Sequence, residues 1–176
     1  MTNYIFCLIN DMGRAQSLVH ALSEMGVSRD QISLLSANPQ DSERLAGNLR
    51  TEVTHGGFTG GNIGGAIGWL VGLSTFAIPG LGLFVAAGPI VGFLAGIMVG
   101  KKLGNLKGAM MEEMGIPDDL LAHFEAELKA GQIVMSLKMP TNESVERAVE
   151  LLRLSGGTEI GFKLDAVPAV TDITKK

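Results

Sequence analysis

The stretch GGFTGGNIGGAIGW, residues 56–69, decides how this chain is interpreted, because half of its residues are glycine. Phosphate-binding loops, flexible linkers and closely packed helices can all be glycine-rich. Here the glycines keep a register of four residues, which places them on one face of a helix. The glycines in register are Gly56, Gly60, Gly64, Gly68 and Gly72, then Gly88, Gly92, Gly96, Gly100, Gly104 and Gly108. A linker has no reason to keep this spacing, so we predict packed helices.

The residues around these glycines are apolar. None of the 48 residues between Glu52 and Lys101 is Asp, Glu, Lys or Arg. Two runs of 18 residues, 61–78 and 83–100, would each form about 27 Å of helix at ~1.5 Å per residue, close to the ~30 Å core of a bilayer. The sequence PGLG at 79–82 is a turn signal between them. We therefore predict that residues 56–108 form a helical hairpin that crosses a membrane and packs through its glycines.

The number of glycines supports an apolar environment for this hairpin. An interior glycine destabilises a helix by about 1 kcal/mol relative to alanine, so eleven of them cost on the order of 10 kcal/mol. Many small domains have no more stability than that in water, whereas lipid enforces the helix. Two interpretations of Pro89 stay open: it kinks the second helix, or it is the first residue of that helix and 80–88 form an irregular apex.

The segments on either side of the hairpin carry charges and regular patterns. Residues 1–50 predict a strand, a helix and a strand, and residues 132–166 repeat that order. A connecting helix is expected at 109–131, with Pro117 as its first residue, and a flexible tail at 167–176. Two such units predict an α+β, ferredoxin-like split β-α-β fold, with two helices on one face of a four-stranded antiparallel sheet and the hairpin inserted between its halves.

The charges at the ends of the hairpin predict its orientation. Lys101 and Lys102 directly follow the second apolar run, and His55 precedes the first. These three residues are expected at the membrane boundary, with the lysines on the cytoplasmic side. The N-terminus has no basic segment typical of a secretory signal. We therefore expect a bacterial inner-membrane protein whose ferredoxin-like domain lies in the cytoplasm.

The composition argues against several other functions. The net charge of −4 gives no basic patch, so nucleic acid is not an expected partner. The sequence GIMVGKK at 96–102 lacks the hydroxyl residue of a phosphate loop, and the single cysteine, Cys7, is expected to be a buried thiol. We expect no catalytic residues, no cofactor and no metal site, and hence no enzyme.

Two groups of side chains offer metal chemistry as an alternative. Asp119, His123 and Glu127 are spaced four apart, which allows contact with one metal ion, but a solvated helix face is the favoured interpretation. Three methionines could also bind a soft metal, although apolar packing is favoured for them. They are Met110, Met111 and Met114.

Two longer stretches carry a family resemblance. IPGLGLFVAAGPIVGFLAG at 78–96 and GIPDDLLAHFEAELKAGQIVMSLKM at 115–139 resemble a family of bacterial general-stress or low-temperature-induced membrane proteins. The resemblance covers about residues 56–140 and departs from the family pattern at Leu83, where a proline is expected. It implies membrane association through a glycine zipper and a non-enzymatic, stress-linked role. It supplies no catalytic residues.

The leading functional hypothesis is a self-assembling stress or envelope protein. Its glycine faces would drive membrane insertion and homo-oligomerisation, and its cytoplasmic domains would pair through sheet surfaces. One alternative is a membrane-tethered regulatory module that binds a small ligand, which rests on fold analogy alone. Another is a soluble oligomeric shell with the hairpins buried inside. A channel is disfavoured, because the hairpin holds few polar residues.

Overall fold

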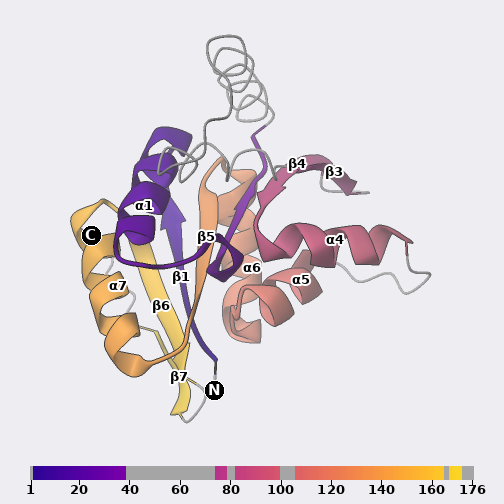
Figure 1. The fold of residues 1–176 in the computed structure, drawn as a ribbon. Helices are drawn as coiled ribbons and strands as arrows, with labels where there is room; N and C mark the ends of the chain where they lie inside the picture. Colours follow the sequence, from indigo (N-terminus) through magenta and orange to yellow (C-terminus); the bar gives the residue numbers. More distant parts are fainter. Residues whose placement is uncertain (1, 39–73, 79–81, 100–105, 165–166, 172–176) are drawn as a thin grey trace, which may run out of the picture.

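The computed structural model describes residues 2–38, 74–78, 82–99, 106–164 and 167–171. It confirms an α+β protein built on an antiparallel sheet. Its seven strands are arranged in the order β3-β4-β2-β5-β1-β6-β7, and each described pair of neighbours is antiparallel. Helices cover both faces of this sheet: α1 and α7 lie on one side, and α4, α5 and α6 on the other (Figure 1).

The first predicted β-α-β unit is confirmed. It consists of β1 (Asn3–Ile9), α1 (Met12–Glu24) and β2 (Ile32–Ser36), with a short 3-10 helix η1 at Arg29–Gln31. Asp11 caps α1, because its carboxylate accepts a 2.9 Å hydrogen bond from the Arg14 N–H. Gly26 follows the helix at φ 86°, a left-handed conformation that suits glycine and is common directly after the end of a helix.

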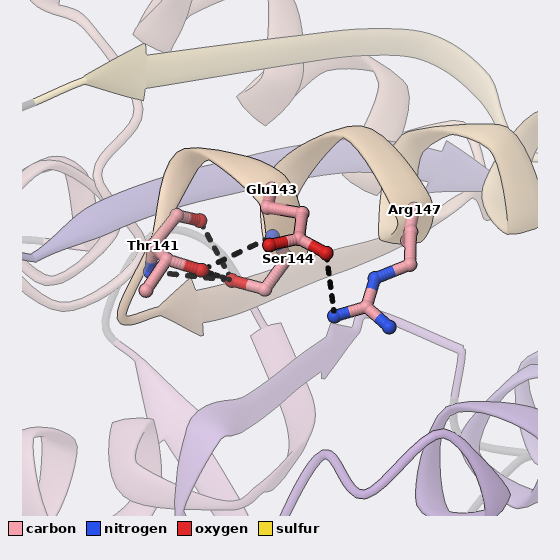
Figure 2. Close-up of polar contacts among 4 residues, drawn as sticks. All are labelled: Thr141, Glu143, Ser144 and Arg147. Carbon is pink, nitrogen blue, oxygen red and sulfur yellow. Dashed lines mark hydrogen bonds and ion pairs between the residues drawn. The ribbon is translucent and has the colours of Figure 1, made fainter.

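The second unit is also confirmed, with β5 (Ile133–Met139), α7 (Asn142–Leu154) and β6 (Thr158–Leu164). Figure 2 shows how α7 begins: Thr141 Oγ1 accepts a 3.2 Å hydrogen bond from the Ser144 N–H. In return, the Ser144 hydroxyl accepts one from the Thr141 N–H at 3.2 Å. This reciprocal cap satisfies two backbone donors that the first turn of a helix leaves without partners.

The two units interleave in the sheet. β5 lies between β1 and β2, and β6 pairs with the other side of β1. Met135 of β5 therefore faces Cys7 on one side and Leu34 on the other. The central position of β1 explains why both of its faces are apolar.

Two separate cores result from this arrangement. The first core lies between the sheet and helices α1 and α7, and includes Ile5, Cys7 and Ile9 of β1. The second core lies beneath α4, α5 and α6, and includes Phe6 and Leu8 of the same strand. The sequence predicted helices on one face only. Because the chain itself covers both faces of β1, no bare face remains on this strand for the predicted pairing of sheet surfaces.

The predicted helix over 83–100 is wrong in its first part. The chain forms β3 (Ser74–Ile78) and β4 (Gly82–Ala87) before α4 (Pro89–Val99) begins. Phe84, Val85, Ala86 and Ala87 are buried, and β4 pairs with β2, so this segment extends the sheet. Its apolar residues serve the protein core, and average hydropathy does not separate a buried strand from a helix. Of the two interpretations of Pro89, the structure supports the first residue of a helix.

The length of α4 bears on the membrane prediction. Its 11 residues correspond to about 16 Å at ~1.5 Å per residue, roughly half of a bilayer core. Across the part of the chain that the structure describes, no helix combines the length and apolarity needed to cross a membrane. The first predicted membrane helix lies outside the described residues up to position 73, and its last five residues form β3.

The regions that flank the second unit also differ from the prediction. The connecting helix expected at 109–131 consists of two helices, α5 (Leu106–Glu113) and α6 (Asp118–Lys129), separated by Gly115 at φ 71°. Pro117 directly precedes α6 and is not its first residue. In the predicted flexible tail, Val167–Thr171 forms β7, which pairs with β6.

Candidate helix-packing face

Four of the glycines in the predicted register lie in the described part of the chain. Gly88 directly precedes α4, Gly92 and Gly96 lie within α4, and Gly108 lies half-buried in α5. The other predicted residues lie outside the described residues: Gly56, Gly60, Gly64, Gly68, Gly72, Gly100, Gly104, His55, Lys101 and Lys102. The glycines at α4 are the ones whose surroundings the structure describes.

Gly88 has a different role from the one predicted. Its φ is 81°, and a Cβ built there would lie 1.9 Å from the Ile32 carbonyl oxygen in β2. Glycine is required here by the left-handed conformation and by the close backbone of the neighbouring strand. Pro89 then starts the helix with a φ suited to the first helical position. Gly88 therefore joins β4 to α4 and is not part of a helix-packing face.

The two remaining glycines lie on the outer face of α4. Ile90 and Leu94 are buried in the second core, at 0% and 4% exposure. Gly92, Ala95 and Gly96 are exposed. The spacing of four between the glycines, with alanine beside them, makes this face smooth. We call these three residues the α4 small face.

The described residues leave the space in front of the α4 small face open. A Cβ built on Gly92 or on Gly96 would meet no described atom within 4 Å. Each glycine nevertheless destabilises the helix by about 1 kcal/mol relative to alanine. No described contact offsets this loss. The backbone of an approaching second helix would provide such contacts.

The electrostatics of this face differ from those of the neighbouring helices. α4 contains no charged residue. On α5 and α6, by contrast, Lys107 and Lys129 both pair with Glu125, at 3.7 and 2.7 Å. The hydrogen bond from Lys129 lowers the pKa of Glu125. The surface of α5 and α6 thus suits water, whereas α4 presents a neutral surface to which a second apolar helix can bind without desolvating a charge.

The residues weighed for metal or thiol chemistry have other surroundings. Among the described residues, no three His, Cys, Asp or Glu side chains are placed to hold one metal ion. The His123 Nε2 instead pairs with the Glu159 carboxylate, which joins α6 to β6. Burial raises the pKa of the Cys7 thiol to about 12, so it stays protonated at neutral pH. Met110 and Met114 are fully buried in the second core, whereas Met111 is exposed.

The sequence analysis missed two features of this region. Ala95 contributes to the small face, although only glycines were considered. Phe76 and Phe84 occupy positions where the glycine register would have continued, and they pair directly across β3 and β4. Two bulky residues in that register were a signal that the glycine spacing does not continue through 74–87, where the chain forms β3 and β4.

Comparison with known proteins gives no match to a family model, to a curated protein or to a solved structure.

Proposed function

We propose that this protein is a non-enzymatic, self-assembling protein whose copies associate through the α4 small face. One observation carries the proposal. Gly92 and Gly96 lie on an uncharged helix, and no described residue occupies the space in front of them, although alanine would give a more stable isolated helix. A second helix backbone that approaches this face gains close contacts that a larger side chain would prevent.

The proposal includes a ferredoxin-like core. The four strands of the two β-α-β units have the order β2-β5-β1-β6 with antiparallel neighbours, which supports this assignment. The β3–β4 hairpin and helices α4, α5 and α6 are additions to that core. The hairpin extends the sheet from β2, and the three helices cover the sheet face opposite α1 and α7.

The proposal also retains an association with the cytoplasmic face of a bacterial inner membrane. Its support is the charge-free region 53–100 and the resemblance to stress-related membrane proteins, which implies a stress or envelope role. Because 83–87 belong to the sheet, the membrane contact proposed here does not involve a spanning helix over 83–100. Fractionation of cells followed by a carbonate wash tests it: retention in the membrane pellet supports insertion, and release supports a soluble assembly.

The self-assembly is tested by changing Gly92 and Gly96 together to leucine. Since each Cβ would enter open space, the fold of a single copy should be kept. Leucine is also a better helix former, so the stability of the single copy should rise by up to about 1 kcal/mol per glycine. We expect the oligomer to dissociate nonetheless, as measured by size-exclusion chromatography with light scattering.

The matched control places the same pair of leucines on another helix. Ala122 and Ala126 of α6 are exposed and also four residues apart. Their double change to leucine should leave the oligomer intact. If the glycine variant and the control both keep the oligomer size of the unchanged protein, association through the α4 small face is wrong.

A further inference from the structure

The sheet has two edges, and they are built differently. β3 forms one edge and β7 the other, on opposite sides of the molecule (Figure 1). The outer side of an edge strand carries backbone N–H and C=O groups that can pair with another strand. Among the described residues, no strand pairs with the outer side of β3 or of β7.

The β7 edge contains two features that discourage further pairing. Pro168 lacks a backbone N–H and therefore removes one donor from the strand. The pairing of β7 with β6 also shifts register between Phe162 and Leu164, which interrupts the regular ladder. Prolines and bulges are common means by which proteins protect edge strands.

The β3 edge has neither feature. Its sequence, STFAI, contains no charge and no proline. All five residues pair with β4 in one continuous register, from Ser74 opposite Ala86 to Ile78 opposite Gly82. Phe76 is buried in the second core at 7% exposure, which anchors the strand. Within the described residues, β3 is thus a regular, neutral edge that has neither of the two protections found at β7.

We propose that β3 pairs with β3 of a second copy of this chain, in antiparallel orientation, so that the sheet continues across the dimer. A two-fold axis places identical strands antiparallel, so one strand supplies both halves of the contact. Because β3 itself contains no charged residue, two chains of net charge −4 can bring these strands together without repulsion between the strands.

The position of α4 favours a second copy over a foreign peptide. This helix contacts β2 and β4, and its Ile90 and Leu94 share the second core with Phe76 of β3. α4, which carries the α4 small face, therefore belongs to the same side of the sheet as the β3 edge. The inference rests on the proposed self-assembly and adds a sheet contact to it.

The test introduces a charge at one edge and the same charge at the other. Thr75→Lys places a lysine in β3, and Ala169→Lys serves as the matched control in β7. Sedimentation velocity of the full chain should show that Thr75→Lys raises the dimer dissociation constant by about tenfold or more, whereas the control leaves it unchanged. Equal dissociation constants for the two folded variants would overturn the inference.

Hydrogen exchange of the unchanged protein gives an independent measurement if Thr75→Lys fails to fold. Exchange at residues 74–78 should slow by about tenfold or more when the concentration rises from well below to well above the dissociation constant. Protection that does not depend on concentration would overturn the inference, because another part of the same chain would then cover the edge.

The two proposals fail in different ways. Assembly that requires Gly92 and Gly96, with exchange at β3 independent of concentration, would refute the edge contact and leave the α4 small face standing. Assembly that survives the glycine variant but is lost in Thr75→Lys would refute the α4 small face and leave the edge contact standing.

Discussion

Helices α7 and α4 both cover the sheet, on opposite faces, yet their outer surfaces have little in common. α7 begins with a reciprocal side-chain cap and carries exposed charges, among them the Glu143–Arg147 pair at 3.7 Å (Figure 2). α4 begins at Pro89, directly after the left-handed Gly88, and contains no charge. The buried sides of the two helices are equally apolar, so burial alone does not distinguish them. They differ in their outer surfaces: that of α7 is charged and suits water, whereas that of α4 is uncharged and is the surface that we propose binds a second copy.

The largest effect is expected from breaking the attachment of α4 and its hairpin to the sheet. Phe84 is fully buried in the second core, so Phe84→Ala should lower the free energy of unfolding by about 3–5 kcal/mol. Urea unfolding followed by circular dichroism measures it. Phe93→Ala is the matched control, and the smaller burial of Phe93 predicts a smaller loss.

The same experiment tests whether the glycine-rich region belongs to the same folding unit as α7. If it does, Phe84→Ala shifts a single transition in which all helical signal is lost. A helical transition that stays at the urea concentration of the unchanged protein would show that α4 and its hairpin are dispensable for the rest of the fold.

A smaller effect is expected for alanine substitutions at Gly88 and Gly92. These two glycines belong to the same register, yet the substitutions should change the free energy of unfolding in opposite directions. Gly88→Ala combines a left-handed φ with a Cβ 1.9 Å from a backbone oxygen of β2, so it should destabilise the fold by about 2–3 kcal/mol. Gly92→Ala should stabilise the single copy by up to about 1 kcal/mol. Both values come from urea unfolding under conditions in which the protein is a monomer. Equal changes in the free energy of unfolding at the two positions would contradict the conclusion that Gly88 is required by the backbone whereas Gly92 lies on an exposed face.

The regular half of the fold was predictable because several local signals agree there. In β1 both faces are apolar, which is typical of a central strand, Asn10 and Asp11 are residue types that cap helices, and Gly26 is a residue type that ends them. Each signal arises from neighbouring residues and does not depend on the rest of the chain.

The β3–β4 hairpin and α4 were harder to predict, because the glycine register and the apolar composition both suggested two helices, 61–78 and 83–100, joined by a turn at 79–82. Which of two structures an apolar segment adopts depends on distant partners, and β2 supplies the edge to which β4 pairs. The second core could not be predicted either. It joins Phe6 of β1 to Phe124 of α6, with ring centroids 5.5 Å apart, and nothing local to either residue reveals this contact.

The candidate face was predicted in part. The register identified Gly92 and Gly96, which are exposed, but it also included Gly88, whose role is conformational. Spacing alone does not distinguish a glycine required by the backbone conformation from one on an exposed helix face, because Gly88, Gly92 and Gly96 all follow the same interval of four. The difference lies in φ and in the distance to β2, which only the three-dimensional structure provides.

The smallest effect is expected at the start of α7. There a side-chain hydroxyl caps the helix, whereas α4 is preceded by a glycine in a left-handed conformation. Thr141→Ala removes the acceptor for the Ser144 N–H and should lower the free energy of unfolding by about 1 kcal/mol. Thr141→Ser keeps the hydroxyl and should lose much less, since serine is an equally good cap. Urea unfolding of the two variants checks this. A serine variant as unstable as the alanine variant would mean that the threonine methyl group, and not the cap, stabilises this end. If the cap is confirmed, the starts of the two helices differ in what they require. α7 requires a hydroxyl at position 141, which serine can supply. α4 requires glycine at position 88, because β2 leaves no room for a Cβ there.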